Sequence, residues 1–508
     1  MNPLHSLTLG DSLHSLTLGD VAREHRRSWP LATAVVDGDT RLTYPELDDR
    51  VNRLANALAA EGVGAGDRLL WLGQNSHRVL ESLLAAAKLG AVLCVANWRQ
   101  SGAELRFVLG DLEPAAVLWQ PLDGVADVRD AAEKARWIAD GEEYEAFLAS
   151  GAPDDPGCDV DPATPVLALY TAAFDGTPNA ALLSHAALIG HSMSLALARQ
   201  MEPGFAYLNS GPLFHVGTMM FCLATFQLGG KNVFVPSYDA AEAARLIEAE
   251  RCDGAFLFGP MVGALVGAGG GHDLTSLKVP PGNAALDAMV TADTSPWARA
   301  FAGYGQTEVG GMLTYSGYGV GGIGSHGRPS PLVQVRILDP DGVERPPGEI
   351  GELVVRGAHV MSGYHNRPEL TAAKQAGGWH HTGDLGRRET DGTLSFLGPR
   401  LRMLKSGAEN IYPVEVERAL ASHPAVAECA VIGEPDPTWG QRVVAIVVPK
   451  PDTAVDAADL IAHCRDAVAS YKKPSRVEFA DAIPKRGYSP DYDALDTTYG
   501  GGGYPGST

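Results

Sequence analysis

Cysteine is scarce in this chain, and the spacing of its cysteines excludes two common structural devices. Six cysteines are spread over 508 residues without a Cys-x-x-Cys pair. Neither a zinc site nor a disulfide framework is therefore predicted. Buried free thiols in a reducing cytoplasm are the expectation that fits this spacing.

Positive charge is scarce as well. The chain has 40 lysines and arginines against 61 aspartates and glutamates, which gives a net charge of -21. This balance argues against binding to nucleic acid or to an anionic membrane surface. A ligand that carries phosphate would need basic groups gathered at its own site.

Long apolar runs are also missing. The apolar run at residues 83–98 is interrupted by Lys88, and no charged leader followed by an apolar core opens the chain. We therefore predict no membrane span and expect a cytoplasmic protein.

What is present is the composition of a globular protein. Hydrophobic residues make up 45% of the chain and charged residues 20%, which suits a body of several layers with a smaller domain. Residues 69–72 and 91–95 are apolar strand candidates, and residues 77–90 between them have helical spacing. This alternation predicts a layered α/β body.

Other segments give weaker predictions. Helices are predicted at residues 20–29, with Asp20 as the cap, and at residues 47–61. The acidic stretch at residues 123–161 is expected to be rich in loops. A direct repeat of seven residues near the start is too short to indicate a repeat architecture. Towards the C-terminus, helices are predicted at 412–420 and 457–468, and strands at 426–432 and 442–448.

Four short motifs follow one another along the chain. Pro-Leu-Phe-His-Val-Gly occupies residues 212–217, Tyr-Gly-Gln-Thr-Glu residues 304–308, Thr-Gly-Asp residues 382–384, and Lys-Ser-Gly-Ala-Glu-Asn residues 405–410. In sequence and in order they resemble the motifs of the acyl-adenylate-forming superfamily, which includes the acyl-CoA synthetases and ligases. The resemblance extends over about residues 42–485.

The resemblance implies a fold and a domain organisation. The fold would be the α/β, multi-layer fold of the adenylate-forming enzymes. A large N-terminal domain of sheets and helices, residues 1–398, would bind the acyl-adenylate. A small, mobile α+β C-terminal domain, residues 399–508, would move over it.

By the same resemblance, one group of residues would bind the AMP moiety. Thr307 would contact the α-phosphate and count among the catalytic residues, and Glu308 would lie in the magnesium or phosphate region. Asp384 would accept hydrogen bonds from both ribose hydroxyls. Whether Mg²⁺ takes part stays open. The residues implied in nucleotide and CoA binding are Gly282, Asn283, Ala284, Tyr304, Gly305, Gln306, Thr307, Glu308, Asp384, Arg400 and Lys405.

His215 and Gly407 are the candidates for thioester chemistry. The resemblance implies that His215 is a gate between the acyl pocket and the thiol tunnel, and that the Gly407 loop forms one wall of the pantetheine tunnel. Without the resemblance to the family, a single histidine beside apolar residues would be interpreted as a residue of the hydrophobic core. Lys405, Lys472 and Lys473 are candidates for the CoA phosphates, although a solvated basic face gives the same pattern.

The acyl group would be bound by apolar residues. Met219, Met220 and Phe258, together with His215 and Gly305, are candidates for a pocket that takes a bulky hydrophobic group. The apolar members of this set fit a hydrophobic core equally well.

The chain departs from the family at the phosphate loop. Residues 170–185 keep the frame of that loop, but a cradle for ATP phosphates needs glycines, hydroxyls and a lysine. Residues 172–175 are Ala-Ala-Phe-Asp instead, and Asn179 stands at the lysine position. Asp175 adds repulsion where the triphosphate would lie.

Two more positions depart from the family pattern. The hinge arginine expected at the ribose is displaced by one position, to Arg400, and Leu401 replaces the polar pivot. In the last motif, Pro490 stands where the catalytic lysine is expected.

These losses affect the two half-reactions of the family differently. Adenylation needs cations and donors around the phosphates, and each lost group typically costs ~10²–10³ in rate. Thioester formation starts from an activated mixed anhydride and needs orientation, a tunnel for the thiol and a seat for AMP. The residues for the second half-reaction are retained, so we predict that adenylation alone is impaired.

The pattern of losses resembles that of non-adenylating acyl-CoA ligases in platensimycin-type diterpenoid biosynthesis. We therefore predict an enzyme that converts a preformed, hydrophobic diterpenoid acyl-adenylate and CoA to acyl-CoA and AMP. A separate adenylating synthetase would supply the adenylate.

Two alternatives stay open. One is a complete ATP-dependent acyl-CoA synthetase in which Lys485, Arg486 or Arg400 replaces the lost lysine. The other is a catalytically silent regulator that binds acyl-adenylate or acyl-CoA. The sequence does not distinguish CoA from a carrier-bound pantetheine.

Overall fold

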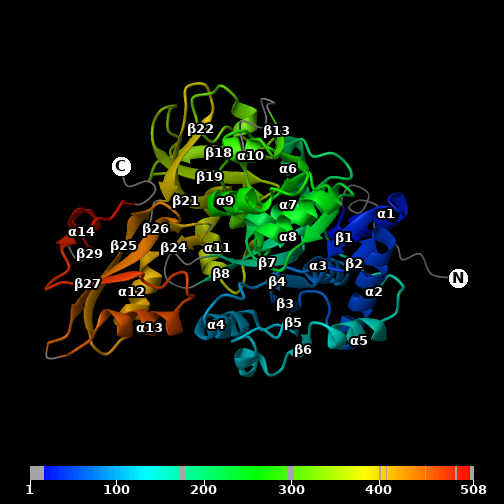
Figure 1. Ribbon diagram of the computed structural model, residues 1–508, viewed down its shortest axis with the longest axis horizontal. Coiled ribbons are helices and arrows are strands. Elements are labelled where there is room, and N and C mark those ends of the chain that lie inside the picture. Colours follow the sequence, from blue (N-terminus) through cyan, green and yellow to red (C-terminus); the bar gives the residue numbers. More distant parts are fainter. Residues whose placement is uncertain are drawn as a thin grey trace.

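The computed structural model describes residues 16–171, 178–293, 303–399, 402–407, 409–451, 453–486 and 489–503. These residues form a large body and a small domain that lie side by side (Figure 1). The body ends with strand β22 (Leu394–Pro399), and the small domain begins with β23 (Leu404–Ser406).

The first sheet of the body has seven strands and is mostly parallel. Its central strands are buried on both faces, as expected for apolar strands covered by helices. The predicted alternation is confirmed by β3 (Arg68–Leu72), α3 (His77–Leu89) and β4 (Val92–Val95). The strand order is β20-β8-β7-β4-β3-β5-β6. The other members are β20 (Gly363–Tyr364), β8 (Asn179–Ser184), β7 (Pro165–Thr171), β5 (Ala116–Trp119) and β6 (Arg136–Ala139).

The second sheet has the strand order β11-β9-β10-β1-β2. Helix α7 packs against it with a largely buried surface. Its strands are β11 (Gly254–Ala255), β9 (Ala206–Asn209), β10 (Lys231–Phe234), β1 (Thr33–Asp37) and β2 (Thr40–Thr43). The helices of the body are α1 (Leu18–Ser28), α2 (Tyr44–Ala60), α3, α4 (Gly102–Leu112), α5 (Glu142–Ser150), α6 (His185–Arg199), α7 (Val216–Gln227), α8 (Ala240–Glu250), α9 (Gly259–Ala268), α10 (Ala284–Asp287) and α11 (Pro368–Lys374).

A third, antiparallel sheet brings the Thr-Gly-Asp motif next to the small domain. Its order is β18-β19-β21-β22, with β18 (Val333–Leu338), β19 (Gly351–Gly357) and β21 (His380–Arg388). Asp384 on β21 is in register with Pro399 at the end of β22. Short strands complete the body: β12 (Leu274–Val279), β13 (Val290–Ala292), β14 (Gly305–Gln306), β15 (Gly311–Met312), β16 (Thr314–Tyr315) and β17 (Arg328–Pro329).

The small domain is a mixed sheet with helices and has its own core. Its order is β24-β23-β26-β25, and β27 pairs with β26. The helices and strands predicted between residues 412 and 468 are confirmed, with ends shifted by a few residues. Its elements are β24 (Glu409–Ile411), α12 (Pro413–Ala421), β25 (Val426–Asp436), β26 (Gly440–Pro449), α13 (Ala457–Ala467), β27 (Arg476–Phe479), β28 (Lys485–Arg486), β29 (Ser489–Pro490) and α14 (Tyr492–Tyr499).

Two local predictions were wrong. Asp20 is not the cap of α1: the hydroxyl of Thr17 accepts from the Asp20 N–H at 3.1 Å, and the Asp20 carboxylate accepts from the Thr17 N–H at 2.9 Å. This capping box puts Asp20 inside the first turn. Residues 123–161 are also less loop-rich than expected, because β6 and α5 lie within them.

The cysteines largely follow the expectation. All six are free thiols, and Cys94, Cys222, Cys252 and Cys464 are buried, but Cys158 is exposed. In the part of the chain that is described, no helix combines the length and apolar character needed to cross a bilayer.

Candidate active site

The side chains of the second and third motifs meet in one buried cluster. The Tyr304 hydroxyl donates to Asp384 Oδ2 at 2.6 Å, and Gln306 Nε2 donates to the same oxygen at 2.7 Å. Gln306 Nε2 also donates to the backbone oxygen of Thr382 at 3.0 Å. The Tyr304 ring stacks on Phe396, with centroids 4.9 Å apart. We call Tyr304, Gln306, Glu308 and Asp384, which the resemblance implies in nucleotide binding, the nucleotide seat.

Both carboxylates of the nucleotide seat are buried. Burial raises the pKa of Asp384 to about 6, although the hydrogen bonds from Tyr304 and Gln306 act in the opposite direction. Burial also raises the pKa of Glu308, against the hydrogen bond that the Tyr364 hydroxyl donates at 2.9 Å. The seat therefore holds two carboxylates whose ionised forms need donors or cations.

The substitution Asp384→Asn is expected to change how stability depends on pH. The pKa of about 6 in the folded state lies above the ordinary value of 3.8. The folded state therefore binds the proton more tightly than the unfolded state, and protonation of Asp384 stabilises the fold. This contribution is complete below about pH 3.8 and is lost as the pH rises through 6. Between those values the difference in unfolding free energy, wild type minus variant, should fall by on the order of 3 kcal/mol. Urea unfolding at several pH values measures it, and a difference that does not change with pH would contradict the prediction.

The other predicted residues near the seat have defined positions. A side chain at Gly305 would place its Cβ 2.0 Å from the Gly311 carbonyl oxygen, so only glycine fits this pairing of β14 with β15. Thr307 opens the short 3₁₀ helix that carries Glu308. Lys405 is exposed, and its Nζ donates to Asn410 Oδ1 at 2.8 Å.

The described residues do not form a metal cage. Among them, no group of three or more His, Cys, Asp or Glu side chains is arranged to hold a metal ion. A magnesium ion bound beside a phosphate would be held by phosphate oxygens and one or two carboxylates, and Glu308 is the carboxylate predicted for it.

His215 lies at the border between the two domains. Its Nε2 is 3.0 Å from Glu409 Oε2, and Arg99 Nη2 is 2.5 Å from Glu409 Oε1. Burial alone would raise the pKa of Glu409, but the hydrogen bond from His215 and the charges of His215 and Arg99 lower it to about 2. Glu409 comes from the small domain, whereas His215 and Arg99 come from the body. This contact therefore joins the two domains at the predicted gate.

Gly407 lies next to this contact. Its N–H donates to the Trp439 carbonyl oxygen at 2.6 Å, and its φ of +60° is in the left-handed region. A Cβ at Gly407 would be 3.2 Å from the Trp439 ring and 3.9 Å from the Phe258 ring of the body. A side chain at this position would therefore touch the body as well as Trp439.

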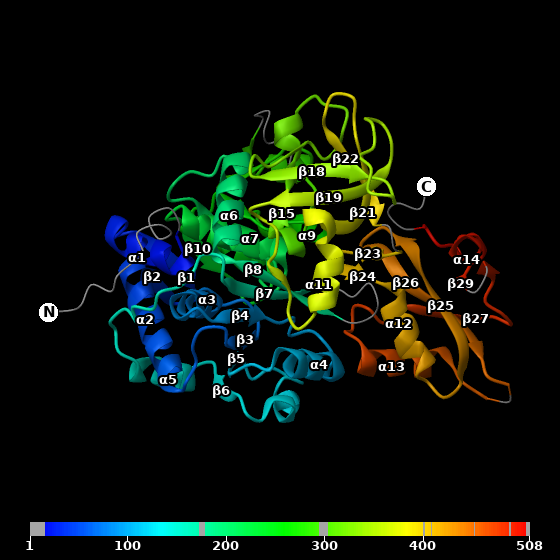
Figure 2. The same ribbon diagram turned by 180° about the vertical axis from the view of Figure 1, so that it is seen from behind.

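Lys472 forms a second, buried contact between the domains. Its Nζ is 2.8 Å from Glu104 of α4 and 2.8 Å from Glu415 of α12. Beside it, the Ser101 hydroxyl donates to the Ala467 carbonyl oxygen at 3.0 Å. Both views show α13 next to α4 (Figures 1 and 2). The structure thus gives Lys472 a bridging role instead of the predicted place on a face that binds CoA phosphates.

Replacing Lys472 with methionine is expected to weaken the docking of the small domain. Removing one partner of a buried ion pair leaves uncompensated charge and typically costs 3–5 kcal/mol, here carried by Glu104 and Glu415. We expect a larger radius of gyration by small-angle scattering. Lys473→Met is the matched control, because the neighbouring Lys473 is only partly buried and donates to a backbone carbonyl oxygen, not to a carboxylate. Unchanged scattering in Lys472→Met would contradict the prediction.

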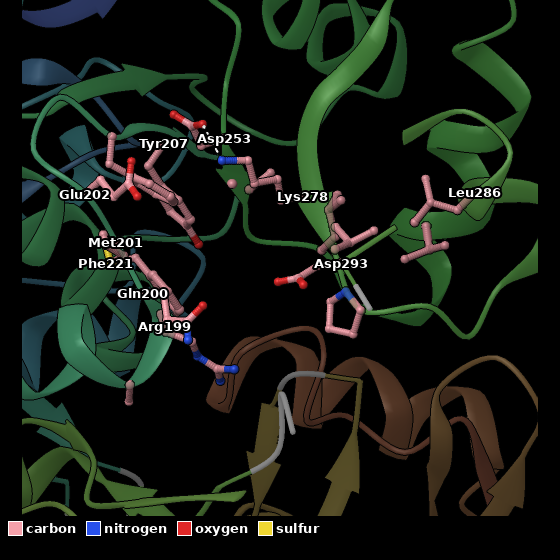
Figure 3. Close-up of a pocket in the computed structure, with 18 of the residues that line it drawn as sticks. Arg199, Gln200, Met201, Glu202, Tyr207, Phe221, Asp253, Lys278, Leu286 and Asp293 are labelled. Atoms are coloured by element: carbon pink, nitrogen blue, oxygen red, sulfur yellow. Dashed lines mark ion pairs between the residues drawn. The ribbon is translucent and has the colours of Figure 1, made fainter. Parts of the chain in front are cut away.

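A cavity of about 650 Å³ opens beside the predicted adenine turn (Figure 3). Gly282 and Asn283 line it, and Asn283 caps α10, which begins at Ala284. One wall is aromatic: Tyr207 stacks on Phe221, with centroids 4.9 Å apart. The turn thus borders a space large enough for part of a ligand.

The residues predicted to bind the acyl group have different surroundings. Met219 lies in the main hydrophobic core, whereas Met220 lies in a separate cluster with Phe221. The two methionines are successive residues of α7, so their side chains point about 100° apart. Phe258 faces Gly407. None of the three is among the described residues that line the cavity.

Several predicted departures from the family fall outside the described residues. These are Arg400 in the hinge and residues 172–177 of the phosphate loop. In the last motif, Pro490 pairs with Lys485 in a short hairpin, and Lys485 Nζ is 2.9 Å from Glu428 Oε1. In this arrangement Lys485 is bound within the small domain.

Sequence reasoning missed three residues at or near the site. Arg99 pairs with Glu409 across the domain border. Trp439 lies against Gly407 within the small domain. Lys374, at the end of α11, donates to the carbonyl oxygen of His381, next to the Thr-Gly-Asp motif. None of them belongs to a motif, so a single sequence carries no signal for them.

The fold and the site define a two-domain protein with a buried cluster around Asp384 and a charged contact of His215, Glu409 and Arg99 between the domains. The AMP-binding enzyme family matches residues 22–365, and its C-terminal domain matches residues 415–488. The chain therefore belongs to the AMP-binding enzyme family, within its acyl-CoA ligases and synthetases.

Individual relatives agree with this assignment. The chain is 36% identical to a feruloyl-CoA synthase from Amycolatopsis sp, over 91% of this chain and 94% of that protein. It is 34% identical to an indoleacetate–CoA ligase from Aromatoleum aromaticum, over 90% of this chain and 92% of that protein. It also resembles a double mutant of o-succinylbenzoate CoA synthetase from Bacillus subtilis, bound with its product analogue. That match has a TM-score of 0.79 and 25% identity, over 92% of this chain and 95% of the other. The predicted adenylate-forming fold is confirmed.

Proposed function

We propose that this protein carries out the thioester-forming half of an acyl-CoA ligase reaction. It takes a preformed acyl-adenylate and CoA and releases acyl-CoA and AMP, and a separate synthetase supplies the adenylate. The observation that carries the proposal is the docked loop: Glu409 bridges His215 and Arg99 while the nucleotide seat stays formed.

In this reaction one substituent of the acyl carbon is replaced: the CoA thiolate takes the place of AMP. The CoA sulfur forms a bond to that carbon, the bond to the phosphate oxygen breaks, and AMP leaves with the electron pair. The thiol proton goes to solvent. A thiol with an ordinary pKa of ~8.5 attacks as its thiolate, so orientation and exclusion of water are the contributions required.

The residues present fit the two ligands. Asp384 would accept hydrogen bonds from the ribose hydroxyls, and Tyr304 and Gln306 hold its carboxylate in place. The pantetheine arm would pass along Gly407, which faces Phe258 of the body. His215 would separate the acyl group from this arm.

Impaired adenylation is supported by the missing cations. Asn179 replaces the loop lysine and Pro490 the terminal lysine, and Lys485 is bound to Glu428. Without these charges the triphosphate would be poorly neutralised.

The acyl group is proposed to be a rigid, hydrophobic, cyclic acid, most like a diterpenoid acid. Two relatives are named for CoA esters of cyclic acids, feruloyl and indoleacetyl. The aromatic wall formed by Tyr207 and Phe221 beside the adenine turn suits such a ring system.

A complete ATP-dependent ligase is the second candidate. It is favoured by the similarity to a CoA synthase and a CoA ligase over nine tenths of the chain. In that case a cation from another position would have to replace the lost lysines.

Two reaction mixtures, followed by mass spectrometry, test the proposal. One contains the protein, a hydrophobic carboxylic acid, ATP, magnesium and CoA, and the other contains the synthetic acyl-adenylate and CoA. Acyl-CoA from the second mixture alone is the expected result. Acyl-CoA from the first would establish the complete ligase, and product from neither, with adenylate bound, would indicate a silent binding protein.

A further inference from the structure

Lys374 is a basic residue that no motif predicts at the nucleotide seat. It ends α11, which lies at the border of the body facing the small domain (Figure 2). Its Nζ donates to the His381 carbonyl oxygen at 3.2 Å. The same atom is 3.2 Å from the position that a Cβ on Gly383 would take. The ammonium group therefore lies against the backbone of the strand that carries Asp384.

The charge of Lys374 reaches both carboxylates of the nucleotide seat. Burial raises the pKa of Asp384 and of Glu308, and Lys374 acts against it at both groups. His380 on the same strand cannot share this role, because burial, with the charge of Lys374, lowers its pKa to about 3. The imidazole is therefore uncharged at neutral pH.

A nucleotide would add negative charge to a seat that already holds two buried carboxylates. Glu308 is 6% exposed and Asp384 is 8% exposed, so solvent screens their charges poorly. Binding a phosphate next to them requires a positive partner. The phosphate loop and the last motif do not supply their usual lysines.

We propose that Lys374 is a nucleotide-binding residue whose ammonium group pairs with the phosphate of the AMP moiety. This inference rests on the proposed function and adds a residue to its nucleotide seat. Lysine suits the role because it acts as a point charge on a flexible stem. It would occupy the place of the missing cations from a helix that precedes the Thr-Gly-Asp motif.

The same charge would assist the departure of AMP. The phosphate of the mixed anhydride carries one negative charge, and free AMP carries up to two once the bond to the acyl carbon has broken. The electron pair of that bond moves to a phosphate oxygen, so negative charge grows during the step. A cation beside it stabilises the transition state more than the bound adenylate.

Calorimetric titration of the full chain with AMP and with adenosine tests the inference. The variants are Lys374→Met, which keeps the apolar stem, and Lys374→Arg, which keeps the charge. Lys450→Ala is the matched control, because Lys450 is exposed and also donates to a backbone carbonyl oxygen. We expect Lys374→Met to weaken AMP binding ~10- to 100-fold, the usual value of a charged hydrogen bond. Adenosine binding should not change, and Lys374→Arg should restore most of the AMP affinity.

The outcomes separate this inference from the proposed function. Equal AMP affinity in Lys374→Met and wild type would overturn the inference and leave the function standing. Equal weakening of AMP and adenosine would also overturn it, since it would indicate a structural role through His381. If the wild type binds neither AMP nor adenosine, the nucleotide seat is absent and both proposals fall.

Discussion

Alanine at position 384 is expected to abolish the conversion of a synthetic acyl-adenylate to acyl-CoA. Asp384 is the acceptor to which Tyr304 and Gln306 both donate, at 2.6 and 2.7 Å. Its removal takes away the contact proposed for the ribose and leaves two buried donors without their acceptor. Charged hydrogen bonds contribute ~1.5–3 kcal/mol each, so losing two should lower kcat/KM by at least ~10²-fold.

The control for this variant is Asp341→Ala. Asp341 is exposed in a turn of the body, so the same loss of a carboxylate should leave the rate unchanged. Calorimetric titration with AMP should also show lost binding in Asp384→Ala. Full thioester activity in that variant, with the fold intact by circular dichroism, would refute the proposed nucleotide seat.

A bulky residue at position 407 is expected to block thioester formation while adenylate binding persists. Gly407 has φ +60°, and its Cβ would lie between the Trp439 ring at 3.2 Å and the Phe258 ring at 3.9 Å. A leucine side chain would fill the space proposed for the pantetheine arm and would strain the backbone by ~1–3 kcal/mol. Misplacing the thiol by about 1 Å costs ~10²-fold in rate, and blocking its path should cost more.

Backbone strain has to be separated from blockage in this experiment. Gly342→Leu is the matched control, because Gly342 has φ +81° and a Cβ there would meet nothing within 4 Å. Stopped assays with the synthetic adenylate measure thioester formation, and titration with a non-reactive adenylate analogue measures binding. Loss of both in Gly407→Leu would count against the tunnel.

These two variants examine different ligands. Asp384 belongs to the proposed seat for AMP on the body, and Gly407 belongs to the small domain, next to the contact of Glu409 with His215. If the two losses are as expected, Asp384→Ala will impair binding and Gly407→Leu will impair catalysis. Lys472 adds a separate contact between the two domains through Glu104 of the body.

The cluster around Asp384 was largely predictable from the sequence. Tyr304, Gln306 and Asp384 come from two short motifs, and the structure brings them together. Their role in binding a nucleotide stays a prediction. The alternation of apolar strands and amphipathic helices also predicted the layered body and most of the small domain. Such patterns are local, because the periods of strands and helices are properties of neighbouring residues.

The contacts between the domains were decided by the tertiary structure alone. Arg99 and Glu409 are 310 positions apart, and Lys472 and Glu104 are 368 apart. Lys472 looked like a solvated basic residue until the structure buried it between two carboxylates. Lys374 became a candidate only because α11 places its ammonium group against β21. Charge pairs of this kind leave no periodic trace in a sequence, since their energy depends on burial and distance, which only the packed chain sets.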